Sequence, residues 1–178
     1  MDEKELNEKQ KKFVEHLFFQ TAWNVATQHN GIWNDGTTER VKRKFKRAVK
    51  EMLVTMLAEY KNPVTPEKHM ENIKKLQTLA SENGERLDTG KSQKILNVMC
   101  KFYWCNGWIT TPPHLTIDQQ ILNKLSGEYA ELKNVNWTEL NDETYAKIIK
   151  KAYEFTTSRG YAAPVEWELE NWRNTLDS

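Results

Sequence analysis

Apolar residues recur three or four positions apart along most of the chain, which is the spacing of one face of an α-helix. No stretch alternates apolar and polar residues as a half-buried strand would, so we predict no sheet. The chain is therefore predicted to be all-α. The expected helices run from about Glu5 to His29, Thr37 or Thr38 to Asn62, Thr65 to near Gly84, Gly90 to the break at Pro112, Ile117 to Leu125, Thr138 or Asn141 to near Gly160, and from Pro164 onward.

The helix that begins near Gly90 carries apolar residues on most of its circumference, which is typical of a helix buried on all sides. Its apolar residues are Ile95, Leu96, Val98, Met99, Phe102 and Tyr103. A length of 178 residues suits one domain with its own core, and no linker divides the chain. We therefore expect residues 1–178 to form a compact single domain of about seven helices around a buried central helix.

The composition narrows the class of protein further. Apolar residues make up 38% and charged residues 29%, which favours a globular protein over a disordered one. No window approaches the roughly 18 apolar residues of a membrane span, and the charged N-terminus lacks the apolar stretch of a signal peptide. Cys100 and Cys105 form neither a disulfide framework nor a zinc site, so we expect them to be buried apolar residues in a cytoplasmic protein without a metal.

Charge is distributed unevenly although its sum is only +1. Between Arg40 and Lys50, seven of the eleven residues are basic. Such a run, with Arg43, Lys44 and Arg47 at its centre, is typical of a surface that binds nucleic-acid phosphates. The alternative interpretation is a solvated helix face with no partner.

One segment, from Asp88 to Leu125, carries candidate chemistry. A glycine opens the buried helix, whose first two turns contain Lys91 and Lys94. A loop broken by prolines follows, and Asp118 then begins a short helix that continues with Ile121, Leu122 and Leu125.

This order of residues resembles the helix-hairpin-helix superfamily of DNA glycosylases, and is closest to its archaeal 8-oxoguanine DNA glycosylase branch. The resemblance implies that Gly90 is the turn glycine, that Lys94 is the catalytic lysine, and that Asp118 is the catalytic aspartate. The turn has one glycine where the superfamily usually has two, so the register of the lysine stays open and Lys91 remains a candidate. If the resemblance holds, Gly90, Ser92 and Lys101 are expected to bind DNA near the start of this helix.

Lysine and aspartate suit the cleavage of an N-glycosidic bond. The reaction builds positive charge on the sugar, which a carboxylate such as Asp118 stabilises, and the carboxylate can also take a proton from the nucleophile. A lysine attacks only when neutral, and burial near a helix N-terminus lowers its pKa. The alternative roles are structural: Asp118 as a helix cap, and the lysines as the wet edge of the helix.

A flipped base also needs a pocket, and aromatic side chains commonly stack on such bases. Trp104, Trp108 and His114 lie near the candidate pair in sequence and are predicted to line that pocket. His114 could instead bind a loop carbonyl. Three other tryptophans, Trp23, Trp137 and Trp172, are expected to lie in the core.

The resemblance thus implies a DNA glycosylase that excises a modified or damaged base from double-stranded DNA, and we expect no cofactor, metal or membrane partner. The alternative is a non-catalytic helical module that binds nucleic acid or another protein.

Overall fold

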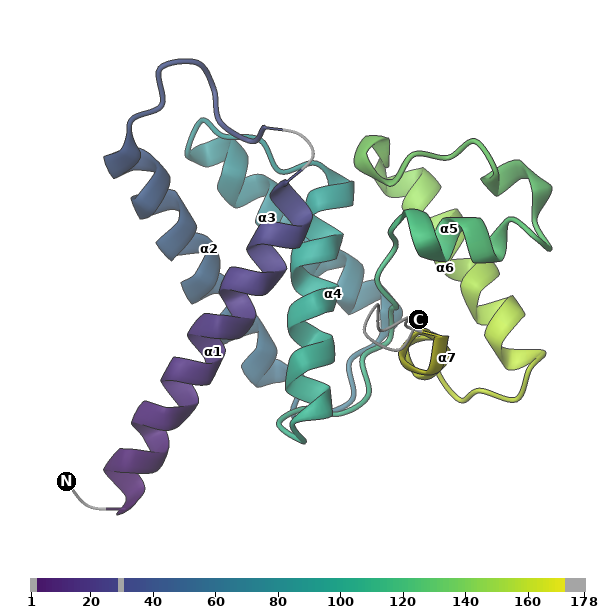
Figure 1. The fold of residues 1–178 in the computed structure, drawn as a ribbon, viewed down its shortest axis with the longest axis horizontal. Coiled ribbons are helices and arrows are strands. Elements are labelled where there is room, and N and C mark those ends of the chain that lie inside the picture. Colours follow the sequence, from purple (N-terminus) through teal and green to yellow (C-terminus); the bar gives the residue numbers. More distant parts are fainter. Residues whose placement is uncertain (1–2, 29–30, 172–178) are drawn as a thin grey trace, which may run out of the picture.

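The computed structural model describes residues 3–28 and 31–171, and in that part of the chain it contains helices and no strand (Figure 1). The prediction of an all-α protein with seven α-helices is confirmed. Trp172 lies outside the described residues. The elements are α1 (Glu3–Thr27), α2 (Glu39–Glu59), α3 (Pro66–Glu82), α4 (Thr89–Cys105), α5 (Gln119–Leu125), the 3₁₀ helices η1 (Ala130–Leu132) and η2 (Trp137–Glu139), α6 (Asp142–Thr157) and α7 (Pro164–Asn171).

Most of these helices begin where the sequence supplies a capping side chain. In each case an oxygen of the cap residue accepts a hydrogen bond from the backbone N–H three residues later, which satisfies one of the unpaired amides of the first turn. The caps are Thr38 for α2, Thr65 for α3, Asp88 for α4, Asp118 for α5 and Asn141 for α6. The predicted boundaries hold to within a few residues, except that α4 ends at Cys105, well before the expected break at Pro112. The sequence does not predict the two 3₁₀ helices, because three residues are too few to show a period.

Helix α4 is the centre of the molecule, as predicted. Thirteen of its 17 residues are buried, and it packs against α1, α2, α3, α6 and η2. In Figure 1, α1 crosses in front of α2 and α4, while α5, α6 and α7 lie on the other side of α4. The core is one continuous cluster that includes residues of every α-helix. Cys100 is buried in it, but Cys105 is exposed at the end of α4, so the prediction of a buried Cys105 is wrong.

The core also contains a chain of polar side chains centred on His69 of α3, which has no exposed surface. Its Nε2–H donates to Asn97 Oδ1 at 2.6 Å, and its Nδ1 accepts from the Tyr60 hydroxyl at 2.8 Å. Both ring nitrogens are therefore satisfied in the neutral imidazole. Burial lowers the pKa of His69 to about 4, since the charged form would lose its hydration.

A second buried histidine extends this network. His114 packs beside His69 with ring centroids 4.5 Å apart, and its Nδ1 accepts from the Tyr145 hydroxyl at 3.0 Å. Asn97 Nδ2 lies 3.1 Å from the same hydroxyl. Burial lowers the pKa of His114 well below the ordinary value, and the neighbouring His69 lowers it further. The network joins α3, α4 and α6 through neutral groups only.

Stability should therefore fall on mild acidification. The unfolded chain binds a proton at each histidine near pH 6.5, whereas folded His69 binds one only near pH 4, so the unfolded state holds more protons between these values. The contribution of the buried neutral histidines to the free energy of unfolding is fully present above about pH 6.5. It decreases as the pH falls, with a slope of up to about 1.4 kcal/mol per pH unit for each histidine. Denaturant unfolding between about pH 7 and pH 5 measures it.

A matched control is His16→Gln, since His16 is exposed on α1 and lies outside the network. This variant should show the same pH dependence as the parent protein. A free energy of unfolding that stays constant over this range would contradict the neutral buried pair.

Candidate functional site

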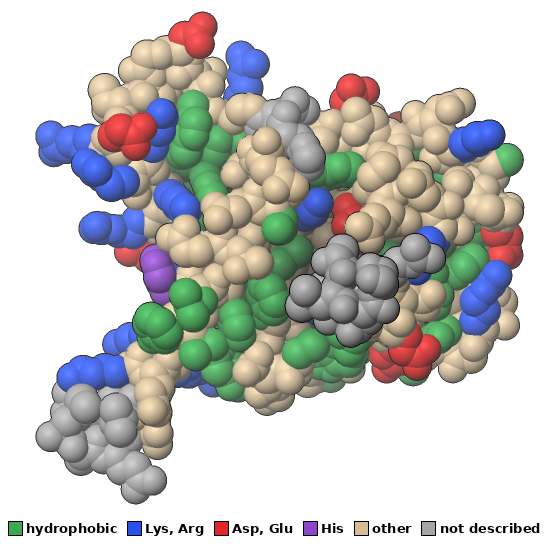
Figure 2. Space-filling view, viewed as in Figure 1, with side chains coloured by type: hydrophobic (Ala, Val, Ile, Leu, Met, Phe, Trp, Pro, Cys, Tyr) green, Lys and Arg blue, Asp and Glu red, His purple; other side chains and the backbone are tan. Residues whose placement is uncertain are grey.

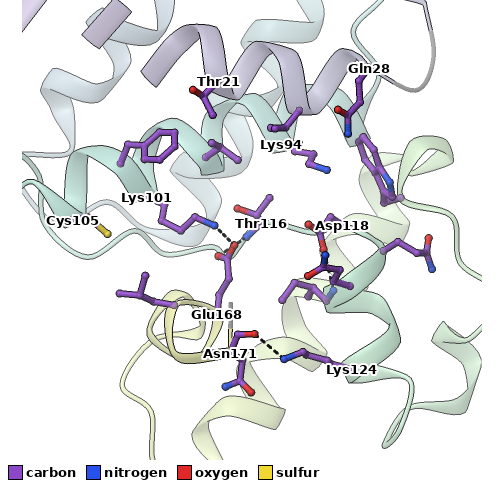
Figure 3. Close-up of a pocket in the computed structure, with 18 residues that line it drawn as sticks. Thr21, Gln28, Lys94, Lys101, Cys105, Thr116, Asp118, Lys124, Glu168 and Asn171 are labelled. Carbon is purple, nitrogen blue, oxygen red and sulfur yellow. Dashed lines mark hydrogen bonds and ion pairs between the residues drawn. The ribbon is translucent and has the colours of Figure 1, made fainter. Parts of the chain in front are cut away.

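A cavity of about 550 Å³ opens between α1, α4, α5, η2 and α7 (Figure 3). Its volume is within the range of small-molecule pockets, about 300–1,000 Å³. Three segments far apart in sequence supply most of its polar side chains: α4, the loop that leads into α5 together with α5 itself, and α7. The polar groups that face it include Lys94, Lys101, Thr116, Asp118, Lys124 and Glu168.

One stripe of α4 forms a wall of this pocket. Lys94, Val98, Lys101, Phe102 and Cys105 all line it, and their spacing of three or four residues places them on the same helical face. The apolar members continue the core to the pocket surface, and the two lysines point into the cavity in Figure 3. The pocket is thus a hollow beside the central helix, with basic groups on an apolar wall.

The opposite wall depends on a clamp between α4 and the loop before α5. Gln93 Oε1 accepts from the backbone N–H of Ile117 at 3.1 Å, and Gln93 Nε2 donates to the carbonyl of the same residue at 2.7 Å. One turn further along α4, Asn97 Nδ2 donates to the carbonyl of Leu115 at 2.9 Å. These bonds satisfy the backbone of a buried extended segment and fix the position of the residues on either side of Ile117.

Asp118 follows this clamped residue and has two roles. Its Oδ1 accepts from the backbone N–H of Ile121 at 3.0 Å, so it caps α5. It also lines the pocket, on the side that faces Lys94 (Figure 3). The capping role and the pocket position are therefore compatible, since a carboxylate has acceptor capacity left after one bond.

Lys94 is only 8% exposed, and its Nζ lies 4.0 Å from the centre of the Trp137 ring. Burial lowers the pKa of its ammonium group, the Asp118 carboxylate raises it, and the charge of Lys101 lowers it. The net shift of the pKa is downward. Lys94 is therefore a buried lysine within electrostatic reach of a carboxylate, with its charge held over an aromatic face.

Trp137 reaches Lys94 because α4 carries a glycine at its first turn. A Cβ atom at Gly90 would overlap the carbonyl oxygen of Trp137, so only glycine allows η2 to pack directly against the helix. The backbone of Gly90 has no positive φ. Its expected role as a turn glycine is therefore wrong: the residue is needed for close packing.

Glu168 of α7 is 4% exposed and connects the third segment to the other two. Its Oε1 accepts from Lys101 Nζ at 2.5 Å, and its Oε2 accepts from the backbone N–H of Thr116 at 3.0 Å. At the rim, Lys124 Nζ donates to the carbonyl of Asn171 at 2.8 Å. These contacts hold α7 over the cavity and balance the charge of the buried carboxylate.

The structure brings Lys94, Asp118 and Lys101 to one pocket, but not Lys91. The Lys91 ammonium pairs with Asp88, the cap of α4, and does not line the cavity. Of the two lysines left open by the sequence, Lys94 is the one that shares a pocket with Asp118.

Other predicted site residues lie elsewhere. Gly90 and Ser92 are buried, so the prediction that they bind DNA is wrong for this structure. Trp104, Trp108 and His114 do not line the cavity. His114 belongs to the core network, and the two tryptophans are partly buried against the core near the end of α4, where Trp108 packs on Phe18. Nearness in sequence is misleading here, because these side chains point away from the cavity although their backbone is close to it in the chain.

The sequence does not indicate Thr116, Lys124, Trp137 or Glu168 as site residues. Trp137 is predicted to lie in the core, and it is 5% exposed there while also lining the pocket. No local pattern distinguishes Glu168 from the other acidic residues of α7. Only the packing of α7 and η2 against the rest of the fold brings these residues to the pocket.

Arg43, Lys44 and Arg47 are exposed on the N-terminal half of α2, which lies on the other side of α1 from α5 and α7 (Figure 1). They take no part in the pocket. In the described part of the chain, no helix is both long and apolar enough to cross a membrane. Nor do three or more His, Cys, Asp or Glu side chains of the described residues gather as a metal site would require.

The chain matches no protein-family model, no curated protein and no solved structure. The chemistry of the pocket is therefore inferred from its own residues.

We expect Gln93→Met to destabilise the protein by about 2–5 kcal/mol, because it leaves the buried N–H and C=O of Ile117 without partners. Denaturant unfolding measures the decrease. The control is Gln119→Met, since Gln119 is exposed, and it should change stability by less than about 0.5 kcal/mol. Equal effects of the two substitutions would show that the clamp does not hold the loop.

We expect Gly90→Ala to lower the free energy of unfolding by about 1–3 kcal/mol, since the added methyl group forces η2 away from α4. The usual gain from replacing glycine in a helix, about 0.5–1 kcal/mol, works against this decrease. Gly31→Ala is the control, because a Cβ atom there meets nothing within 4 Å. A Gly90→Ala protein as stable as its parent would mean that η2 is not packed as described.

Proposed function

We propose that the protein is a DNA glycosylase that excises a modified or damaged base, with the pocket beside α4 as its active site. The observation that carries this proposal is the presence of Lys94 and Asp118 on facing walls of one cavity. Their order along the chain resembles the helix-hairpin-helix glycosylases, and the pocket gives that order a chemical meaning. Two groups that act on one sugar must share a site.

In the proposed reaction Lys94 is the nucleophile. Its lowered pKa increases the fraction of neutral amine, whose nitrogen attacks C1′ of the flipped nucleotide. The C1′–N bond breaks, and its electron pair leaves with the base, which takes up a proton. The new C1′–Nζ amine loses a proton, and the sugar ring then opens at O4′, which takes up a proton. The product is a Schiff base between Lys94 and the sugar.

Asp118 supports this step in two ways. Its negative charge stabilises the positive charge that develops on the sugar, and after attack the carboxylate takes the proton that the new C1′–Nζ amine loses. Its bond to the backbone N–H of Ile121 fixes the carboxylate in place, so little reorganisation is needed during the reaction.

The rest of the pocket suits a flat, partly polar ligand. Trp137 presents an aromatic surface beside Lys94, and Val98 and Phe102 add apolar walls. Aromatic side chains bind extruded bases by stacking. These features support a nucleobase as the occupant.

The test is base release from duplexes that each carry one modified base, with borohydride trapping of the Schiff base run in parallel. Asp118→Asn retains the size and the capping ability of the side chain, so folding should survive while excision falls by about a hundredfold to a thousandfold. Lys94→Gln should abolish the trapped adduct.

Lys91→Gln is the control, because Lys91 does not line the pocket. It should retain both base release and the adduct. An adduct that is absent in this variant and present in Lys94→Gln would contradict the assignment of the nucleophile. Absence of base release from every duplex would overturn the proposal and leave the non-catalytic binding module.

A further inference from the structure

Four basic residues of α2 form a stripe that the pocket does not use. Arg40, Arg43, Lys44 and Arg47 follow one another at steps of three, one and three residues, which places them on one face of the helix. The buried residues of α2, among them Phe45, Val49 and Leu53, lie on the opposite face. We call these four residues the α2 stripe. All four are exposed, and basic side chains gather at the left edge of Figure 2.

No acidic group in the described part of the chain forms an ion pair with the α2 stripe. The neighbouring Lys42, by contrast, pairs with Glu39 at 2.8 Å. Glu39 is also the only acidic residue in the first turn of α2. The stripe therefore presents its positive charges to solvent.

This arrangement disfavours the helix that carries it. Like charges four residues apart on a helix repel each other, and the stripe contains two such pairs, Arg40 with Lys44 and Arg43 with Arg47. The first turns of a helix also carry the positive end of its dipole, where cations are unfavourable. The Glu39 carboxylate offsets part of this repulsion through its charge interaction with Arg43, and one carboxylate is too few for four cations. An arrangement that opposes local stability in this way indicates a function.

We propose that the α2 stripe binds the phosphodiester backbone of nucleic acid, as a contact surface separate from the pocket. Three of its four residues are arginines, whose planar guanidinium groups bind phosphate oxygens through two parallel hydrogen bonds. A row of cations along one helix face matches a row of phosphates, and such contacts act on any sequence.

The same residues fit an anionic membrane less well. A helix that binds a bilayer surface places its own apolar face in the lipid, whereas the apolar face of α2 is buried in the core. Val41 is the exposed large apolar side chain of this helix. Burial of the apolar face favours nucleic acid as the partner.

Position makes this surface distinct from the pocket. In Figure 1, the N-terminal half of α2, which carries the stripe, lies to the left of α1, whereas α5 and α7, which line the cavity, lie to its right. The stripe would thus contact the nucleic-acid backbone at a distance from the nucleotide in the pocket, or bind a strand while the pocket is empty. Its binding needs neither Lys94 nor a modified base, so its test is independent of the proposed catalysis.

The experiment measures the affinity of the full chain for a short unmodified DNA duplex by fluorescence anisotropy over a series of salt concentrations. The triple variant Arg43→Gln, Lys44→Gln, Arg47→Gln should bind more weakly at low salt. The slope of log K against log salt should become shallower by about 0.9 for each phosphate that the variant no longer neutralises, or about 3 in all.

A control variant removes three positive charges elsewhere: Lys61→Gln, Lys133→Gln, Lys150→Gln, at exposed lysines outside α2. It should retain most of the affinity and most of the salt slope. Equal decreases of affinity in the two variants would show only an effect of net charge and would overturn the proposal. Binding to phosphatidylserine vesicles but not to the duplex would overturn it in favour of a membrane.

Discussion

The hydrogen bonds between the Gln93 side chain and the backbone of Ile117 are the interaction on which the site depends. The loop before α5 is buried, and an extended buried backbone must find partners for its N–H and C=O groups. The Gln93 side chain supplies both partners to one residue, an acceptor for the N–H and a donor for the C=O of Ile117. Gln93 belongs to α4, most of whose residues are buried. The residue that follows is Asp118, so the clamp transmits the rigidity of α4 to the carboxylate.

Polar residues inside α4 thus organise the molecule as much as its apolar ones. Asn97 belongs both to the loop clamp and to the histidine network, and so it couples the pocket wall to α3 and α6. A buried hydrogen-bond network favours one packing arrangement, because other arrangements would leave more of its polar groups unpaired. The pocket lies against this rigid interior, and the proposed catalytic pair would need that support to keep its geometry.

Charge is divided between two surfaces. Inside the pocket, lysines and carboxylates face each other, and burial makes their charges interact strongly. On the α2 stripe, the cations are exposed, so they act over distance and are screened by salt. The first arrangement suits the proposed chemistry on one nucleotide, and the second suits the proposed contact with a nucleic-acid backbone. The two lie apart, because the N-terminal half of α2 is on the other side of α1 from α5 and α7 (Figure 1).

Most of the fold could be predicted from the sequence because its signals are local. The periodic apolar stripes, the caps Thr38, Thr65 and Asn141, and the apolar circumference of α4 each depend on residues within one helix or turn. Lys94 and Asp118 could be chosen as candidate site residues for the same reason, because they belong to one continuous segment. The packing role of Gly90 could not be predicted, since it is decided by a backbone carbonyl that comes from η2.

Tertiary packing decided the membership of the pocket. Trp137 and Glu168 are placed by η2 and α7, and nothing in their own neighbourhoods shows that they will meet Lys94 and Lys101. His114 is close to the candidate pair in sequence, yet its ring lies against His69 in the core. A sequence determines which face of a helix is apolar, whereas the neighbours of that face follow from packing the whole chain at once, which no local pattern records.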